Sequence, residues 1–158
     1  MAVQGLESGK RKRVMAIASG GGHWEQMMML RDAFAGHDVT FVTTLAGLGE
    51  RSGLKNVRLV PDCNRNKPVR AFWALLRILA VIIAIRPQVI ISTGALPGVI
   101  ALALGKRLGA RTIWVDSIAN AEEFSMAGSL ARNHAHLWMS QWPSVASAAG
   151  AEYAGSVL

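Results

Sequence analysis

The sequence has little cysteine and few charged side chains. Charged residues make up 17% of its 158 residues, against about 25% in an average soluble domain. The single cysteine, Cys63, excludes an internal disulfide framework and predicts a reducing compartment. The four histidines lack paired cysteines and HxxxH spacing, so we expect no bound metal.

Acidic residues are scarcer than basic ones. Asp and Glu number 10 against 17 Lys and Arg, a formal net charge of +7. Such an excess favours anionic partners: nucleic acid, phosphorylated ligands or an acidic membrane surface. A hydrophobic content of 51% excludes a disordered chain, and the mean hydropathy of +0.29 indicates contact with an apolar environment.

No secretory signal is present at the amino terminus. Only about six apolar-biased residues separate the basic run Lys10–Arg13 from the following glycines, whereas a signal needs roughly 7–15 apolar residues after its charges. We therefore expect the cytoplasm. The basic run fits a nucleic-acid tag, a contact to anionic lipid headgroups, or a solvated tail. We predict a flexible basic tail over 1–12 and one domain over 13–158.

Strand-like and helix-like segments alternate along the chain. Short apolar runs predict strands at 14–18, 39–43, 57–60, 89–92, 112–115 and 137–141, and a last one near 155–158. Helices are predicted at 23–35, at 69–85, and from the loop after 92 to about 108. This alternation predicts an α/β fold, a Rossmann-like doubly wound parallel sheet.

A run of glycines follows the first predicted strand. Ser19, Gly20, Gly21 and Gly22 precede His23 at the start of a helix, where backbone amides and the helix dipole favour an anion. The register matches neither GxGxxG nor a Walker loop, so the loop favours a phosphate or diphosphate but not NAD or ATP bound in the usual way. A simple tight turn is the alternative. His23 is suited to donate to a phosphate or act as a base.

A second glycine-containing loop, 92–98, also follows a strand. Thr93 and Gly94 lie at its start, and Pro97 suits a first helical turn. Because carboxyl ends of parallel strands share one edge of the sheet, the two loops predict a single ligand crevice.

The segment from 69 to 86 is unusually apolar. Only Arg77 is charged between Arg70 and Arg86, and about fifteen apolar-dominated residues fall short of the roughly 20 that span a bilayer. Arg70 and Arg77 lie on nearly one helix face, with Trp73 close by. We interpret it as a helix in the membrane interface, with Arg70, Trp73, Arg77 and Arg86 at the headgroups. A core helix is the alternative.

Asp116 follows the predicted strand 112–115. A carboxylate at a strand end is a candidate catalytic base, and a helix amino-terminal cap is an equally simple role.

Several short motifs occur together in a fixed order. They are Ser19–His23, Ser92–Gly98, Asp116-Ser117, Ser125–Gly128 and Gln141–Pro143 before a terminal glycine. In this order they resemble PssD-like bacterial polysaccharide-biosynthesis proteins, relatives of the membrane-anchor subunit of the eukaryotic two-part UDP-GlcNAc transferase. The resemblance covers residues 13–158.

This resemblance implies the amino-terminal half of a MurG-like GT-B glycosyltransferase. Such a half binds a polyprenyl-diphosphate-linked sugar at the cytoplasmic face of the inner membrane. A PssE-like partner chain would hold the UDP-sugar donor, and the pair would transfer a glucuronosyl or N-acetylglucosaminyl group in exopolysaccharide assembly. No cofactor is implied.

The resemblance also assigns site residues. It implies that Gly20, Gly21, Gly22 and His23 bind the acceptor diphosphate, and that Asp116 or His23 takes the proton of the acceptor hydroxyl. The eukaryotic pattern has glutamate where Asp116 stands and an amino-terminal membrane helix that residues 1–13 cannot form, so anchoring would fall on 69–86.

Two other functions compete with this one. A non-catalytic membrane scaffold would recruit a soluble glycosyltransferase without contributing site residues. A nucleic-acid-binding protein is supported only by the net charge and the basic run. Scattered basic residues, and aromatics within apolar stretches, argue against a nucleic-acid partner.

Overall fold

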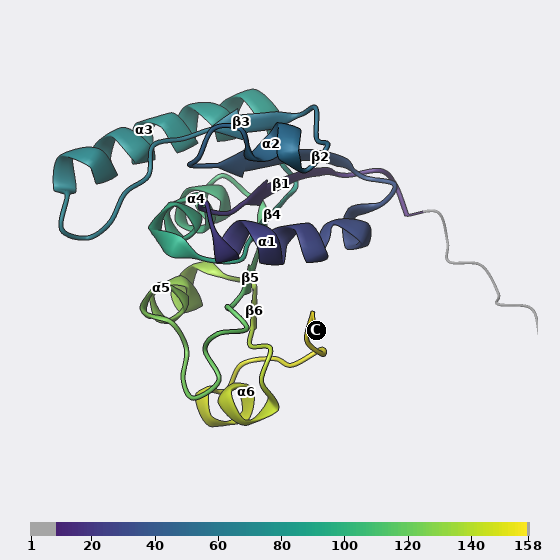
Figure 1. Ribbon diagram of the computed structural model, residues 1–158, viewed down its shortest axis with the longest axis vertical. Helices are drawn as coiled ribbons and strands as arrows, with labels where there is room; N and C mark the ends of the chain where they lie inside the picture. Colours follow the sequence, from purple (N-terminus) through teal and green to yellow (C-terminus); the bar gives the residue numbers. More distant parts are fainter. Residues whose placement is uncertain (1–8, 158) are drawn as a thin grey trace, which may run out of the picture.

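A single parallel sheet organises the protein (Figure 1). The computed structural model describes residues 9–157; residues 1–8, most of the predicted tail, and residue 158 lie outside the described residues. The six strands pair in the order β3-β2-β1-β4-β5-β6, all parallel. They are β1 (Arg13–Ile17), β2 (Asp38–Thr43), β3 (Val57–Leu59), β4 (Val89–Ser92), β5 (Arg111–Val115) and β6 (Leu137–Met139). This confirms the predicted α/β, Rossmann-like doubly wound fold.

Helices connect the strands. They are α1 (Gly22–Met29), α2 (Leu48–Arg51), α3 (Pro68–Ile85), α4 (Ala95–Arg107), α5 (Met126–Ala131) and α6 (Pro143–Ala149), with 3-10 turns at Arg31–Phe34 and Arg132–His134. The helix predicted at 23–35 is shorter than expected. The Leu30 amide bonds to both the Gln26 and Met27 carbonyls, 3.3 and 3.1 Å away, so the chain tightens into the 3-10 turn there.

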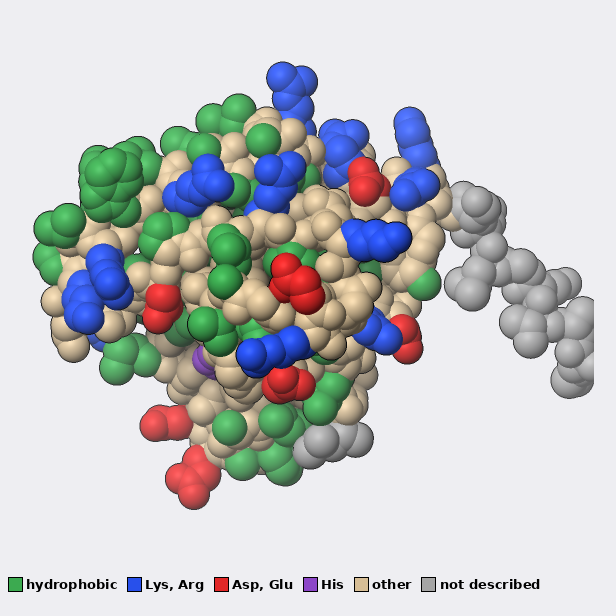
Figure 2. All heavy atoms as spheres, turned by 45° about the horizontal axis from the view of Figure 1, so that its top comes forward, with side chains coloured by type: hydrophobic (Ala, Val, Ile, Leu, Met, Phe, Trp, Pro, Cys, Tyr) green, Lys and Arg blue, Asp and Glu red, His purple; other side chains and the backbone are tan. Residues whose placement is uncertain are grey.

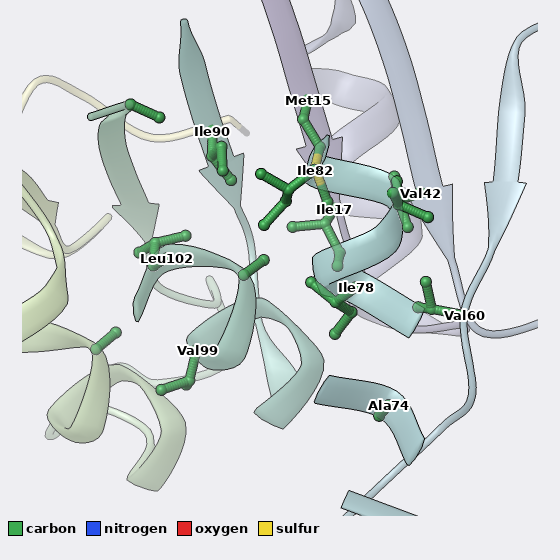
Figure 3. Close-up of a cluster of buried hydrophobic side chains, with 14 of the residues drawn as sticks. Met15, Ile17, Val42, Val60, Ala74, Ile78, Ile82, Ile90, Val99 and Leu102 are labelled. Atoms are coloured by element: carbon green, nitrogen blue, oxygen red, sulfur yellow. The ribbon is translucent and has the colours of Figure 1, made fainter. Parts of the chain in front are cut away.

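One sheet face packs against α3, α4 and α5. Figure 3 shows Met15, Ile17 and Ile90 on the strands directed toward Ile78 and Leu102 on the helices. These residues are fully buried. Side chains alternate across a strand, so every second residue points to this face. The residues between them point to the opposite face, where apolar side chains are also buried. The buried strands therefore read as continuous apolar runs.

The opposite face is covered only in part. α1 supplies Trp24 and Met27, which pack with Phe41 and Val115. Beyond α1, the strands β1, β4, β5 and β6 border an apolar cavity of about 450 Å³. We call this cavity the sheet groove.

The strand predicted at 155–158 does not form among its described residues. Residues 153–157 have no strand, and the sheet's last contact is a parallel bridge between Met139 and Glu152. Gly155 has a φ of +103°, a conformation that leaves the extended region. This part of the chain lines the sheet groove instead.

Candidate functional site

Both glycine-containing loops lie at the point where the strand order reverses. β1 and β4 are neighbours, and Ile17 pairs with Ser92 at their carboxyl ends. In open α/β sheets this switch point is where ligands bind. The strand pairing therefore brings the two loops together at one edge of the sheet, as expected, and the ligand crevice between them stays a prediction.

The first loop turns through Gly21. Its φ of +80° lies in the region that favours glycine, and its carbonyl accepts from the amides of Trp24 and Glu25 as α1 begins. Gly21 and Gly22 are exposed. The first amides of a helix have no intrahelical acceptor. The amides of Gly22 and His23 are therefore donors without an acceptor inside the helix, at the amino-terminal end of α1.

The start of the same loop is held by the protein itself. Ser19 is buried, and the Gly20 amide donates to Thr44 Oγ1 at 3.2 Å. A Cβ on Gly20 would lie 3.1 Å from the Cβ of Leu45. Ser19 and Gly20 therefore shape the loop, while its exposed part begins at Gly21.

His23 joins the two loops. Its Nδ1 lies 3.1 Å from the Thr93 carbonyl oxygen, and Thr93 Oγ1 donates to the His23 carbonyl at 2.7 Å. A carbonyl oxygen only accepts, so Nδ1 carries the proton of this hydrogen bond and Nε2 keeps its lone pair in the neutral ring. The half-buried imidazole is thus held as a proton acceptor at the strand edge.

Gly94 provides the space for that imidazole. It has a φ of +154°, and a Cβ placed there would overlap Nδ1 of His23. Thr93 is fully buried and Gly94 is buried, so the ring rests on backbone that has little room to move. Position 94 requires glycine for both backbone conformation and close approach.

Asp116 is at the centre of a buried hydrogen-bond network. The residue is 2% exposed. Its oxygens accept from Trp114 Nε1 at 3.0 Å, Asn120 Nδ2 at 3.1 Å, the Ser125 amide at 2.9 Å and Ser125 Oγ at 2.6 Å. Ser125 Oγ in turn accepts from the Gly128 amide and caps α5. Among residues 9–157, no hydrogen bond joins Asp116 to His23.

The geometry therefore separates the two candidate bases. Asp116 binds four protein donors and closes the loop between β5 and α5, whereas His23 presents a nitrogen at the edge of the sheet. The alternative role of Asp116, a helix cap, is filled by its neighbour. Ser125 occupies the cap of α5, and Asp116 holds Ser125 in place.

Two glutamines that sequence reasoning missed complete this region. Gln26 on α1 and Gln141 after β6 are both 3% exposed, and each donates to the Asp116 carbonyl, at 3.1 and 2.9 Å. Gln26 Oε1 also accepts from the Ile118 amide at 3.0 Å. A glutamine between Trp24 and Met27, on the apolar side of α1, is the only sequence signal for this role.

α3 is apolar on two opposite sides. Ala74, Ile78, Val81 and Ile82 are buried against the sheet, whereas Val69, Phe72, Trp73, Leu76 and Ile83 are exposed. Phe72 and Trp73 are 60% and 63% exposed. The predicted contact residues Arg70, Arg77 and Arg86 are exposed as well. Figure 2 shows apolar side chains gathered over this part of the molecule with Lys and Arg beside them.

By length and composition alone, α3 is long and apolar enough to cross a membrane, with a mean hydropathy of 2.0 over its 18 residues. Four of those residues belong to the core, so the helix as folded is docked on the sheet by one side. Among residues 9–157, no group of three His, Cys, Asp or Glu side chains is arranged to hold a metal ion.

Solved structures share this fold. MurG of Acinetobacter baumannii matches with 14% identity and a TM-score of 0.71, over 85% of this chain and 43% of that one. UDP-GlcNAc 2-epimerase from Methanocaldococcus jannaschii matches with 13% identity and a TM-score of 0.60, over 79% and 38%. The Streptomyces sp. SF2575 glycosyltransferase SsfS6 matches with 15% identity and a TM-score of 0.55, over 78% and 44%.

No family model and no curated protein sequence matches the chain. It spans less than half the length of the structures it matches. At these identities the likeness concerns the fold, which is the Rossmann-like domain found in GT-B glycosyltransferases and in UDP-GlcNAc 2-epimerases.

Proposed function

We propose that the protein is the acceptor-binding, membrane-associating subunit of a two-component glycosyltransferase. The pair would transfer a glucuronosyl or N-acetylglucosaminyl group from a UDP-sugar to a polyprenyl-diphosphate-linked sugar in exopolysaccharide biosynthesis. The observation that carries the proposal is His23, fixed by Thr93 at the switch point of a fold that aligns with 43% of the MurG chain.

The chemistry assigned to His23 is general base catalysis. The acceptor hydroxyl oxygen forms a bond to the anomeric carbon of the donor sugar while the bond from that carbon to the UDP oxygen breaks. Nε2 of His23 takes the hydroxyl proton, and UDP leaves with the bonding electrons. One base suffices for such an inverting displacement, and its contribution is about 10²–10⁴-fold in rate.

The glycine loop and the second loop supply the proposed acceptor diphosphate site. Gly21 and Gly22 are exposed, so an anion can approach the backbone at the start of α1 closely. Ser19, Gly20, Thr93 and Gly94 hold the loops in this arrangement. The role of Asp116 in this proposal is to keep the β5–α5 loop in place, with His23 as the base.

The exposed side of α3 supports association with the cytoplasmic face of the inner membrane. Aromatic and aliphatic side chains in an interfacial helix insert among the acyl chains, while arginines at its edge bind anionic headgroups. Arg70, Trp73, Arg77 and Arg86 would make the headgroup contacts. Through this helix the subunit would lie on the membrane surface.

The sheet groove supports the need for a PssE-like partner. Parallel sheets are normally covered on both faces, and the groove leaves Val89, Ile113, Leu137 and Met139 only partly buried. An apolar segment of the donor-binding chain would fill the groove. The partner would then complete a two-domain enzyme of MurG-like size.

A transfer assay tests the proposal. Radiolabelled UDP-sugars are mixed with membranes carrying polyprenyl-diphosphate glucose and with this chain, the PssE-like chain, or both. We expect transfer only with both chains, and a loss of at least 100-fold with His23→Gln, whose unfolding free energy should stay within about 1 kcal/mol of the wild type. Transfer by this chain alone would contradict the division into two subunits.

A non-catalytic scaffold remains the competing function, because the exposed side of α3 alone would serve it. A scaffold predicts that His23→Gln leaves transfer unchanged while replacement of Phe72 and Trp73 abolishes it. The two functions are therefore distinguished by the same assay.

A further inference from the structure

A second cavity lies beside the proposed site, between the loop that precedes α3 and the starts of α4 and α5. Its volume is about 560 Å³. Residues 63–66 form one wall, Ala95 and Leu96 of α4 a second, and Met126, Ala127 and Leu130 of α5 the third. We call it the α4–α5 pocket. Sequence motifs did not point to it, because its walls come from three segments that are far apart in the chain.

The lining of this pocket is mostly apolar, with Asn64 and Asn66 as its neutral polar residues and one cation. Met126 and Leu130 are 65% and 45% exposed, although both lie on a helix that packs into the core. Arg65 is the one charged residue of the lining, and no carboxylate of the described residues borders the cavity. Asp62, the nearest acid along the chain, precedes buried Cys63 and is not part of the lining.

Arg65 has no strong acceptor of its own within the described part of the chain. Its Nη1 contacts the sulfur of Met126 at 2.6 Å, and no carboxylate among residues 9–157 forms an ion pair with Arg65. A thioether sulfur is a weak acceptor, whereas a guanidinium binds phosphate oxygens through strong, often bidentate hydrogen bonds. The nearby Asn64 side chain is already used, since its Oδ1 accepts from the Asn66 amide at 3.1 Å. Within residues 9–157, the exposed Arg65 side chain thus has only a thioether as its partner in the protein.

The pocket connects the two parts of the proposed function. Ala95 follows Gly94, on which the His23 ring rests, so one side of the cavity continues into the switch-point loops. On the other side Lys67 leads directly into α3, whose exposed residues Val69 and Phe72 lie in its first turn and a half. A prenyl chain that leaves the membrane at α3 would enter this cavity, and the sugar at its diphosphate end would lie toward His23.

We propose that the α4–α5 pocket binds the lipid-proximal part of the acceptor, a prenyl diphosphate. Arg65 binds an oxygen of the lipid-side phosphate, the sugar-side phosphate lies at the glycine loop as in the proposed function, and Leu96 and Leu130 contact the first prenyl units. This inference rests on the proposed function, because it specifies where that acceptor lies. It also adds a selectivity: the pocket should bind a ligand that carries both a negative charge and a prenyl chain more tightly than a ligand that carries only one of them.

Binding to the full chain measured by titration calorimetry tests the pocket. Farnesyl diphosphate is the probe, and inorganic diphosphate and farnesol each carry one half of its chemistry. We expect Arg65→Gln to weaken farnesyl diphosphate binding about tenfold and to leave farnesol binding unchanged. Leu130→Gln should weaken both. Arg51→Gln, which removes an exposed charge from α2, serves as the matched control and should change neither.

Three results would overturn the proposal. They are no binding of farnesyl diphosphate to the wild type, equal binding by Arg65→Gln and wild type, and equal competition by vesicles of phosphatidylglycerol. The last would show a general lipid-phosphate site. Circular dichroism of each variant separates loss of binding from loss of folding, and Arg65→Lys should recover part of the affinity because it restores the charge without the fork.

The transfer assay separates this proposal from the proposed function. If the reconstituted pair transfers sugar and Arg65→Gln leaves the acceptor KM unchanged, the pocket is wrong and the function stands. If the wild-type pair transfers nothing while farnesyl diphosphate still binds in an Arg65-dependent way, the function is wrong and the pocket stands. We expect an increase of about tenfold in acceptor KM with little change in kcat.

Discussion

Replacing Asp116 by asparagine should destabilise the fold through a misplaced donor. Oδ1 accepts from Trp114 Nε1 and Ser125 Oγ, and Oδ2 accepts from Asn120 Nδ2 and the Ser125 amide. Asparagine keeps the shape but turns one of these oxygens into an NH₂ group. Trp114 Nε1 and the Ser125 amide only donate, so one of them faces another donor whichever way the amide is oriented.

The cost follows from one buried donor left without an acceptor. Asp116 is 2% exposed and Trp114 is fully buried, so water does not replace the lost bond. A buried donor without its partner costs about 1–3 kcal/mol, toward the upper end when the lost acceptor was charged. We therefore expect Asp116→Asn to lower the unfolding free energy by about 2–3 kcal/mol, a large part of a typical 5–15 kcal/mol.

A double-mutant cycle with Trp114→Phe isolates this effect. Trp114→Phe removes the obligate donor opposite Oδ1 and leaves a smaller ring in the core, at a cost of about 1–3 kcal/mol by itself. In that background the side-chain amide introduced at position 116 can direct its NH₂ group to Ser125 Oγ, which is able to accept. Asp116→Asn should then cost about 1–2 kcal/mol less than in the wild type.

Urea unfolding, followed by tryptophan fluorescence and by circular dichroism, measures the unfolding free energy of the wild type, the two single variants and the double variant. The transfer assay measures their activity under conditions in which they are folded. The reasoning is refuted if Asp116→Asn leaves stability within about 0.5 kcal/mol of the wild type but abolishes transfer. That result would make Asp116, rather than His23, the catalytic base.

Three further predictions concern other parts of the molecule. Gly94→Ala should displace the His23 ring, lower the unfolding free energy by about 1–3 kcal/mol and reduce transfer at least tenfold. As the control for stability, Gly22→Ala, whose Cβ would meet open space, should leave the unfolding free energy equal or higher. A stable and active Gly94→Ala variant would contradict the geometry. Phe72→Asp should weaken binding to anionic vesicles, measured by sedimentation, about tenfold or more. It removes an apolar side chain whose burial in the membrane would contribute about 1.5–3 kcal/mol. The melting temperature should change little, since the ring is 60% exposed, and unchanged vesicle binding would argue against the α3 surface. Burial, and then the charge of Asp62, raise the pKa of the Cys63 thiol above its ordinary value. The unfolded chain therefore loses this proton at a lower pH than the folded chain, and the unfolding free energy should fall as the pH rises through the ordinary pKa of a thiol, about 8.5. Alkylation at pH 8 should be slow until denaturant is added, and equally fast labelling with and without denaturant would contradict the burial.

The local elements were largely predictable from the sequence. Continuous apolar runs predict buried strands such as β1 and β4, because both faces of a parallel sheet are covered. Pro87 predicts the end of α3 because it disfavours a helical residue before it, and Arg86 is indeed in the left-handed region with a φ of 50°. The terminal strand was predicted wrongly, since a local pattern does not show whether a neighbouring strand is free to pair.

The candidate site was predictable only in part. Glycines before a helix indicate an anion-binding loop, and two such loops after strands indicate a shared edge. The hydrogen bonds that decide the chemistry join residues far apart, as His23 and Thr93 do over 70 positions. Gln26 lies 90 positions from the Asp116 carbonyl it binds, and no local pattern marks such a pairing.

The sequence alone determined the alternation of strands and helices, the glycine loop beside His23, and the apolar segment with its arginines, because each depends on the order of neighbouring residues. Only the tertiary structure decided the strand order, which brings β1 beside β4. It also decided that α3 is buried on one side and exposed on the other. In the same way it decided that the carboxylate of Asp116 is surrounded by hydrogen-bond donors, and that Arg65 lines a mostly apolar pocket. These properties depend on which distant segments pack together, and packing is set by the burial of whole faces rather than by any one motif.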